Sequence, residues 1–230
     1  MKNSIKLSLT LILLSMSMTL LGQDKETRDL DKFYEIRVSE GIILTAEKGT
    51  KNSMEIEVLS GADIDEVLTQ VRGGQLRVHM ERSNYRRLRV RATLTYTEEL
   101  EEIIVNTGAE GLFKSKITSD RLELSATTSG YIEANLDAGR LYMSASTSGR
   151  IDVQGSADDI SAKASTGGTI YAYDVDGKDV QARANTGADV RISAEDYLSA
   201  SAGTGGSVRY RGKPRTSIRT NTGGSVRSSN

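Results

Sequence analysis

Three aspartates in the second half of the chain have the residue type and the spacing for acid–base chemistry. Asp152, Asp174 and Asp189 recur at intervals close to the period of a repeat in the same part of the chain. Two carboxylates on one face of a β-structure can cleave a glycosidic bond, one acting as the acid and the other as the base or nucleophile. One function predicted from these residues is therefore that of a polysaccharide-acting enzyme, either a lyase or a hydrolase.

The stretch 174–179, Asp-Val-Asp-Gly-Lys-Asp, looks like a fragment of a calcium-binding loop. Asp174, Asp176 and Asp179 would supply carboxylate oxygens, which are suitable ligands for a hard cation. The glutamate that an EF-hand loop requires at its twelfth position is missing. The stretch is therefore interpreted as an ordinary Asp-Gly turn, and we predict neither a metal site nor a cofactor.

The chain contains no Cys and one His among its 230 residues. This composition excludes disulfides, thiolate metal sites, cysteine nucleophiles and metal sites with several histidines. His79 lies between Val78 and Met80 in an alternating pattern, so we expect its ring to point outward from a strand. A Ser-His-Asp triad could use only this ring, and no serine has the context of a nucleophile elbow. We therefore expect no catalytic residues.

Basic side chains gather in residues 205–230, which contain no acidic residue, whereas residues 98–102 hold four glutamates. The candidate binding residues are Arg209, Arg211, Lys213, Arg215 and Arg219. Stacked on one face, they would form a strip that binds an anionic envelope glycan or another cell-surface molecule. Alternatively, like charges at an open sheet edge would prevent end-to-end polymerisation. Nucleic acid is not expected, because the net charge is −1 and only Tyr210 could stack on bases there.

A repeated motif determines how these residues are positioned. Thr is followed by Gly or Ser and then by Gly or Ala, and the motif recurs along the second half of the chain. It begins at Thr107, Thr128, Thr147, Thr166, Thr186, Thr204 and Thr222. A near-constant period of about 20 residues indicates internal duplication.

Apolar and polar residues alternate on both sides of the motif, as in Leu141-x-Met143-x-Ala145 before one copy and Ile151-x-Val153 after it. A period of two indicates strands with one buried face, and strands that recur at a fixed interval favour stacked coils. The predicted fold is all-β, a parallel β-helix (or β-solenoid) with about 18–21 residues per coil. An antiparallel sandwich is the alternative architecture.

Each coil is expected to hold the Thr turn and a second turn rich in Asp, Gly and Ala, such as residues 137–139. The Gly after Thr would adopt a positive φ, and stacked Thr side chains would form a ladder of hydroxyls and methyls. Alanine at inward positions suits the small gap between two facing sheets. At the third motif position, replacing Gly149 or Gly168 with Val is expected to cost about 1–3 kcal/mol if φ is positive there. Coils this short and uniform are expected to leave no residues for the walls of a cleft, which disfavours an enzyme.

The N-terminus has the features of an export signal. Lys2 and Lys6 precede an apolar run over residues 7–21, and Gly22 follows it. Residues 1–22 are interpreted as a signal peptide, with an uncleaved anchor as the alternative. The rest of the sequence contains no second apolar run, so we expect no transmembrane segment in the mature chain. The rest is predicted to be one β-solenoid domain, residues 23–230, with irregular capping coils over 23–100 and regular repeats over 101–230.

The order of apolar residues and glycines resembles a known family. The pattern consists of Phe33-x-x-Ile36-x-Val38, Gly41-Ile42-x-Leu44, Ile56-x-Val58, Val71-x-x-Gly74-x-Leu76-x-Val78 and the train of Thr-Gly/Ser-Gly coils. It is similar to the putative auto-transporter adhesin, head GIN domain family, a domain of unknown function in exported Gram-negative proteins. The resemblance implies a right-handed parallel β-helix in a cell-envelope or surface setting. It implies no catalytic or ligand-binding residues.

The predicted function is that of an exported, non-catalytic, adhesin-like protein of the cell envelope that binds a glycan or another envelope component. The periplasm, the outer-membrane surface and the extracellular space are all open as its location, as is its oligomeric state. The alternatives are the polysaccharide-acting enzyme described above and a periplasmic structural scaffold, including one that assembles head to tail.

Overall fold

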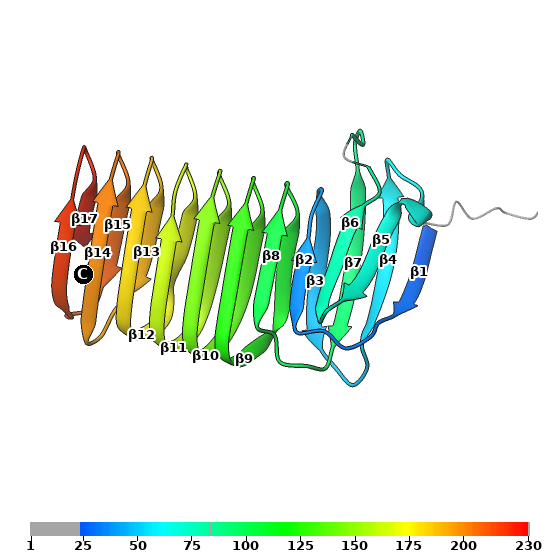
Figure 1. Ribbon diagram of the computed structural model, residues 1–230, viewed down its shortest axis with the longest axis horizontal. Coiled ribbons are helices and arrows are strands. Elements are labelled where there is room, and N and C mark those ends of the chain that lie inside the picture. Colours follow the sequence, from blue (N-terminus) through cyan, green and yellow to red (C-terminus); the bar gives the residue numbers. More distant parts are fainter. Residues whose placement is uncertain (1–23, 83, 230) are drawn as a thin grey trace, which may run out of the picture.

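The computed structural model describes residues 24–82 and 84–229, so the expected signal peptide lies outside the described residues. The protein is a parallel β-solenoid of about seven turns with about 19 residues per turn, which confirms the predicted fold. Figure 1 shows the coils stacked along the long axis, with the last coil at one end and the N-terminal strands at the other. No helix among the described residues is long and apolar enough to cross a membrane.

The regular coils form two facing parallel sheets. We call the one made by the segments after each Thr motif the post-turn sheet, and the one made by the segments before it the pre-turn sheet. Four long strands contribute to both: β9 (Glu110–Thr127), β10 (Tyr131–Ser146), β11 (Arg150–Ala164) and β12 (Thr169–Asn185). In the last coils, β13 (Asp189–Ser193), β15 (Ser207–Arg211) and β17 (Ser225–Ser228) extend the post-turn sheet, while β14 (Tyr197–Gly203) and β16 (Arg215–Thr220) extend the pre-turn sheet.

The expected second turn does not interrupt the hydrogen-bonded ladder in the long strands. Asp137 pairs with Ser156 and Ala138 with Ala157, in the middle of β10 and β11. The two alanines are buried at this bend, where a larger side chain would hold the two sheets apart. The prediction of a separate turn here was therefore wrong, because the strand bends from one sheet into the other without ending.

The Thr turns are tight and identical in form. Thr128 and Ser129 have φ of 49° and 60°, and Thr166 and Gly167 have φ of 48° and 72°. A backbone hydrogen bond closes each turn, as from Gly168 N to Ser165 O at 2.9 Å. Two successive residues with positive φ and this closing bond define a type I′ turn. The positive φ expected after Thr is confirmed, and the structure adds that Thr itself adopts the left-handed conformation.

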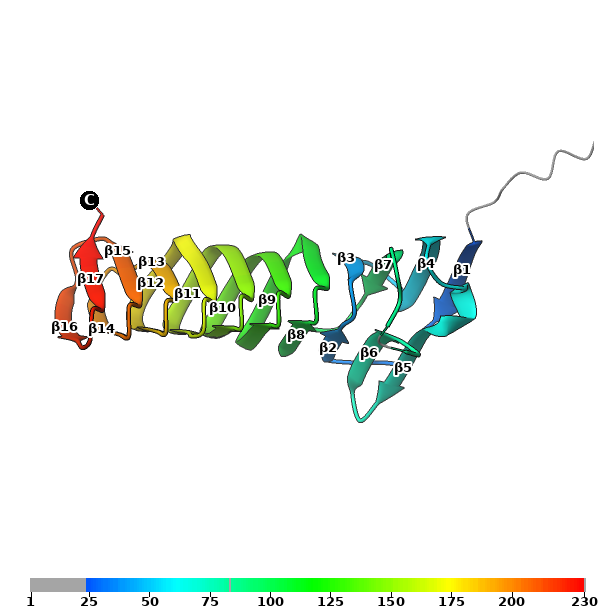
Figure 2. The ribbon, with the colours of Figure 1, turned by 90° about the horizontal axis from the view of Figure 1, so that it is seen from above.

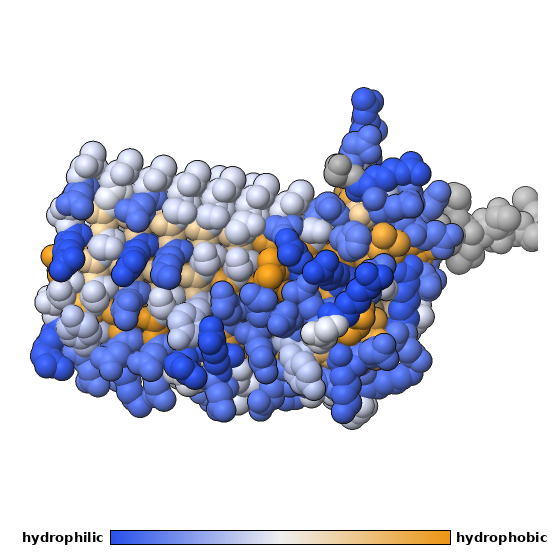
Figure 3. Space-filling view, viewed as in Figure 1, coloured by the Kyte–Doolittle hydropathy of each residue, from blue (hydrophilic) through white to orange (hydrophobic). Residues whose placement is uncertain are grey.

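The turns are connected by their backbone rather than by their hydroxyl groups. Gly167 N donates to Thr186 O of the next coil at 3.1 Å, and the same bond links the other successive turns. Among the described residues, only Thr107 of the motif threonines donates a side-chain hydrogen bond, to Asn106. The predicted hydroxyl ladder is therefore replaced by a backbone ladder. In Figure 3 the exposed turns form a continuous pale row along the upper edge of the coils.

Two of the copies, at Gly149 and Gly168, need Gly at the third motif position for a reason other than the expected one. Neither Gly149 nor Gly168 has a positive φ. A Cβ on Gly149 would stand 2.0 Å from Ala126 O, and one on Gly168 would stand 2.2 Å from Ala145 O. Both positions therefore exclude a side chain because the backbone of the preceding coil approaches too closely.

The core is a set of columns that run along the solenoid. In the pre-turn sheet, buried alanines at 126, 145, 164, 184 and 202 lie in register on consecutive coils. The facing post-turn sheet supplies Ile132, Ile151, Ile170, Val190 and Val208, which are fully buried. This arrangement confirms the prediction that small inward residues accommodate a thin core.

The N-terminal end closes the solenoid with antiparallel strands. One complete coil, β2 (Glu35–Val38) and β3 (Ile42–Lys48), stacks directly beneath β8 (Glu102–Asn106) and β9. Its turn, Glu40-Gly41, has the same left-handed φ pair as the Thr turns. The elements before and after this coil form a cap: β1 (Asp24–Asp29), β4 (Ser53–Ser60), η1 (Ile64–Glu66), β5 (Val67–Arg72), β6 (Gln75–Met80) and β7 (Arg89–Tyr96). Figure 2 shows this broader end beside the narrow regular coils.

Candidate functional site

Two β-bulges stand on either side of a groove in the post-turn sheet. On β9, residues 114–116 lie opposite the single residue Asn135 of β10. On β12, residues 172–173 lie opposite the single residue Val153 of β11. The strands between the bulges, β10 and β11, pair without any register shift. The result is a groove of about 560 Å³ over these two strands, between Lys114 on one side and Tyr173 on the other.

The groove presents four polar side chains on the outer face of the post-turn sheet. Glu133 and Asp152 are neighbours on β10 and β11, and Asn135 and Gln154 are neighbours two residues further along. Phe113, Ala134 and Val153 alternate with these residues, and their side chains belong to the buried core beneath the groove. Because alternate residues of a strand face the same side, the four polar groups project together into the groove.

Arginine and tyrosine side chains alternate in a stack beside the groove. The guanidinium of Arg150 lies 4.5 Å from the ring centre of Tyr171, and Arg191 lies 4.5 Å from the same ring. Arg150 also donates to both oxygens of Asp152, from Nε at 2.9 Å and Nη2 at 2.6 Å. Cation–π contacts and a two-pronged ion pair restrict these side chains, so this wall of the groove is held in place by several contacts.

The Tyr131 hydroxyl adds a proton donor at the edge of the groove. Its oxygen lies 3.0 Å from Glu133 Oε2 and 3.3 Å from Asp152 Oδ2. Burial and the two nearby carboxylates raise the pKa of Tyr131 above its ordinary value. The hydroxyl therefore keeps its proton at neutral pH and connects the two carboxylates.

The five predicted basic residues do not form one strip. Arg209 and Arg211 lie on β15 in the post-turn sheet, and Arg215 and Arg219 lie on β16 in the pre-turn sheet. Lys213 lies in the turn between these strands. The chain crosses from one face to the other at this turn, so residues close in sequence are separated in space.

The structure instead builds an arginine column. Arg191, Arg209 and Arg227 are in register on β13, β15 and β17 of the post-turn sheet. Asp189 pairs with Arg191 at 2.9 Å and lies 3.7 Å from Arg209. Sequence reasoning missed Arg191 because it lies well before the basic segment. The regular interval from one coil to the next, which links positions 191, 209 and 227, is the signal that predicts it.

The three candidate catalytic aspartates share the post-turn sheet, and each faces a different arginine. Asp152 pairs with Arg150, Asp189 with Arg191, and Asp174 lies 3.9 Å from Arg211. Asp152 and Asp174 line the groove, whereas Asp189 lies outside its lining. Each of the three carboxylates is therefore paired with an arginine or lies close to one.

The calcium-loop fragment is not folded as an ion-binding loop. Asp174, Asp176 and Asp179 lie along β12, and all three are exposed. In the part of the chain that the structure describes, no group of three acidic or histidine side chains could hold a metal ion. His79 points outward as expected from the alternation, and its Nδ1 lies 3.0 Å from Met80 O.

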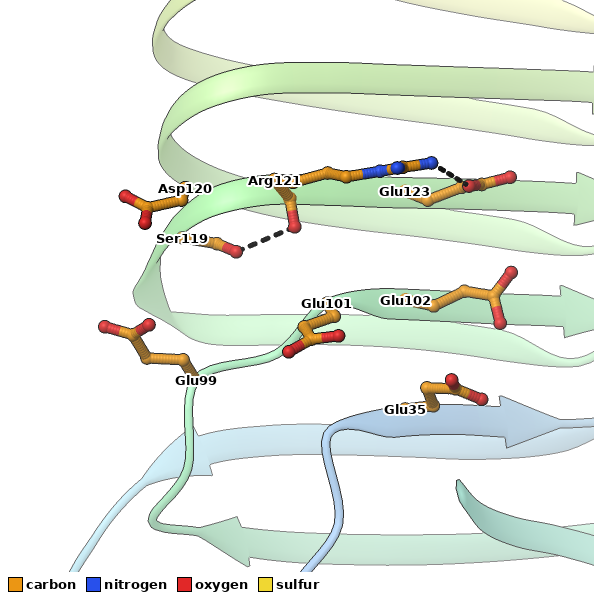
Figure 4. A pocket seen from close by; sticks show the side chains of 8 residues that line it. All are labelled: Glu35, Glu99, Glu101, Glu102, Ser119, Asp120, Arg121 and Glu123. Carbon is orange, nitrogen blue, oxygen red and sulfur yellow. Dashed lines mark hydrogen bonds and ion pairs between the residues drawn. The ribbon is translucent and has the colours of Figure 1, made fainter. Parts of the chain in front are cut away.

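An acidic pocket lies at the other end of the regular coils, on the pre-turn sheet (Figure 4). Glu35, Glu102 and Glu123 are in register on three adjacent strands, and Arg121 lies 3.7 Å from Glu123. Burial and the carboxylates of Glu35 and Glu123 raise the pKa of Glu102. Three of the four glutamates of residues 98–102 line this pocket, whereas Glu98 accepts a hydrogen bond from Asn52. The ion pair and like charges of the pocket identify no ligand.

With this geometry established, the chain was compared with known proteins. It matches the family model described as putative auto-transporter adhesin, head GIN domain, over residues 32–214. The chain belongs to this family. The resemblance inferred from the spacing of apolar residues and glycines is thereby confirmed. A comparison with curated proteins gave no match.

Solved structures share the fold of this head GIN domain protein. A putative adhesin from Bacteroides fragilis is 18% identical, with 90% of this chain and 97% of that chain covered and a TM-score of 0.81. A putative adhesin from Parabacteroides distasonis is 17% identical, with 90% and 97% covered and a TM-score of 0.70. A protein from the same species described as a putative lipid binding protein is 19% identical, with the same coverage and a TM-score of 0.66.

The groove of this head GIN domain protein was not predicted from the sequence, although the repeat intervals carry its signal. The coils that begin at Thr107 and Thr166 are longer, by two residues and by one, than the two coils between them. The additional residues of the longer coils are the two bulges. The expectation that these coils leave nothing to build walls was therefore wrong, since one or two additional residues are enough.

Proposed function

We propose that this protein is an exported, non-catalytic, adhesin-like component of the cell envelope that binds an anionic glycan through the post-turn sheet. Membership of the adhesin family supports the adhesin-like role. The observation that carries the binding proposal is the arginine column, Arg191, Arg209 and Arg227, with Arg211 beside it. Consecutive coils repeat a guanidinium about every 4.8 Å, so several weak contacts with one polyanion add together.

The non-catalytic part of the proposal is supported by the pairing of the aspartates. Asp152 donates no proton in this arrangement, because both of its oxygens accept hydrogen bonds from Arg150. Asp174 and Asp189 also lie opposite arginines. A sugar bound along this face would meet aspartates that each lie opposite an arginine, whereas glycoside cleavage requires one carboxyl group that is placed to donate a proton and a second that acts as base or nucleophile.

A binding experiment tests the glycan proposal with the chain from residue 23 onward. Polygalacturonate, which carries one carboxylate per sugar, is titrated into the protein at low and at high salt. We expect binding that weakens as salt rises, because ions screen exposed charges. The double variant Arg209→Gln, Arg227→Gln should bind polygalacturonate about tenfold more weakly, because two exposed charge contacts are lost.

A matched control changes the same charge on the other sheet. The double variant Arg215→Gln, Arg219→Gln removes two arginines from β16 and should bind almost as well as the parent chain. Equal losses in the two variants would show that net charge alone drives binding, and would overturn the assignment to the post-turn sheet. New reducing ends in the polysaccharide would instead establish the enzymatic alternative.

Protease treatment of intact cells of the source organism tests the location. We expect the protease to remove the protein from the cell surface, as an adhesin-like role requires. If the protein is cleaved only after the outer membrane has been opened, it is periplasmic. In that case adhesion is wrong, and a periplasmic scaffold replaces it.

A further inference from the structure

We propose that the groove between the two bulges is a sugar-binding subsite that holds one pyranose unit of a neutral glycan segment. The proposal rests on the proposed function, because the groove and the arginine column share one sheet. It goes further by assigning a separate site, a different set of residues and an uncharged ligand. The residues that would recognise the sugar are Glu133, Asn135, Asp152 and Gln154.

The amide groups of the groove are available for a ligand. Asn135 and Gln154 make no side-chain hydrogen bond to any other described residue, although they stand side by side in the middle of the groove. Each amide offers two N–H donors and one acceptor oxygen. The neighbouring carboxylates of Glu133 and Asp152 are acceptors only. The groove therefore presents donors in one row and acceptors in both rows.

A pyranose matches this arrangement better than other ligands do. Its hydroxyl groups both donate and accept hydrogen bonds, so one sugar ring can use the amide donors and the carboxylate acceptors together. The volume of about 560 Å³ lies within the range of small-ligand sites. Bulges that re-aim side chains are frequent next to binding sites, and here they form both walls.

Other classes of ligand fit less well. Three carboxylates line the groove, at Glu133, Asp152 and Asp174, and both ends of the Arg150 fork are engaged by Asp152. An anionic group there would meet these three carboxylates, against Lys114 as the other cation of the lining. A peptide could not add as a strand over this region, because β10 and β11 are each hydrogen-bonded to a strand on both sides.

The position of the groove explains how one glycan could reach both sites. The strand β12 separates β11 from β13, which carries the first arginine of the column, at a spacing of about 4.8 Å per strand. A polysaccharide that lies along the solenoid axis would place one sugar in the groove and acidic sugars over the arginines. The two sites would then bind neighbouring units of a mixed neutral and acidic chain.

The test uses neutral oligosaccharides titrated into the chain from residue 23 onward, followed by NMR amide shifts and calorimetry. The probes are hexamers from a β-glucan, a mannan and a galactan. We expect at least one hexamer to bind and to shift the side-chain amide signals of Asn135 and Gln154. The double variant Asn135→Ala, Gln154→Ala should bind it about tenfold more weakly, because its hydrogen-bond donors are lost.

The matched control is Gln181→Ala, an exposed amide on the pre-turn sheet, which should leave binding unchanged. Neither groove amide makes a side-chain hydrogen bond to another described residue, so the double variant should have the same melting temperature as the parent chain. A loss of binding would then not reflect unfolding. Absence of binding by all three hexamers, or equal binding by the double variant, would overturn the groove assignment. Polygalacturonate binding should persist in this variant, which distinguishes failure of the groove from failure of the arginine column.

Discussion

The backbone N–H of Gly108 donates to the carbonyl oxygen of Thr128, 2.9 Å away on the next coil. This bond is possible because both turn residues adopt positive φ, which directs one carbonyl and one N–H along the solenoid axis. The backbone hydrogen-bond ladder that joins successive coils therefore continues through the turns, from one sheet to the other. For Thr this backbone conformation is unfavourable, because its branched Cβ crowds the following carbonyl.

The first prediction is that Thr166→Asn stabilises the protein by about 0.5–1 kcal/mol. Asn tolerates the left-handed conformation far better than Thr, and Asn-Gly is the preferred pair of a type I′ turn. The Thr166 side chain is exposed and makes no hydrogen bond to other described residues, so little packing is lost. Urea unfolding measures the difference.

Thr169→Asn is the control for this change, because Thr169 lies in a strand with ordinary backbone. Asn is disfavoured in strands, so this variant should be neutral or less stable. If both variants lose stability, the turn threonines contribute through their side chains, and backbone strain does not govern the stability of the turns.

The second prediction is that Gly149→Val destabilises the solenoid by about 2–3 kcal/mol, within the range of overpacked cores. The new Cβ would meet Ala126 O at 2.0 Å, and the two coils would have to separate. Gly187→Ser is the comparison, since no atom lies within 4 Å of its Cβ position and Ser148 occupies the equivalent place. It should cost less than about 1 kcal/mol. Thermal unfolding of both variants tests the order.

The third prediction concerns the stack beside the groove. Arg150→Lys should cost about 1 kcal/mol, because an ammonium group can neither pair with both oxygens of Asp152 nor stack flat on Tyr171. The estimate is small because the side chain is half exposed. Arg140→Lys, at an exposed position without such contacts, should stay within about 0.5 kcal/mol of the parent. Equal effects would mean that the stack contributes no stability.

The fourth prediction is a pH dependence at the acidic pocket. Burial, with Glu35 and Glu123 on the adjacent strands, raises the pKa of Glu102. The folded protein therefore binds this proton more tightly than the unfolded chain does, so the contribution of this group to stability is highest at low pH and falls as pH rises through its titration. Glu102→Gln should stabilise the protein at pH 7 by about 0.5 kcal/mol, the scale of one like-charge pair.

The advantage of Glu102→Gln should shrink as the pH falls through the raised pKa of Glu102. It should be gone below the ordinary glutamate value of 4.5, where the parent carboxyl is neutral in both the folded and the unfolded chain. Glu99→Gln is the control, because Glu99 lines the same pocket but lies outside the ladder. It should give a smaller gain at pH 7. A constant advantage at every pH would exclude titration of Glu102 as the cause.

Much of the fold follows from local patterns. The alternation that ends at Ala145 and resumes at Ile151 fixes which side chains are buried on either side of a turn. The repeated Thr-Gly pair predicts a tight turn with positive φ because few residues other than Gly tolerate that backbone. These features depend on neighbouring residues only, so the sequence was enough to predict them.

The candidate site depends on relations between coils. Arg211 and Arg215 are close in sequence but lie on different sheets, because the turn at Gly212 and Pro214 separates their strands. Arg191 and Arg209 are a whole coil apart in sequence but are neighbours in one column. Register between coils therefore decides which charges act together, and a linear segment such as 205–230 misrepresents them.

The sequence by itself determined that this chain coils into a β-solenoid with a thin, alanine-rich core, because periodicity and turn chemistry act over a few residues. Only the tertiary structure decided that Asn135 and Gln154 share a walled groove. That outcome depends on where the additional residues of the longer coils are accommodated. With the apolar columns and the turn-to-turn hydrogen bonds in register, these residues are accommodated as bulges in the post-turn sheet.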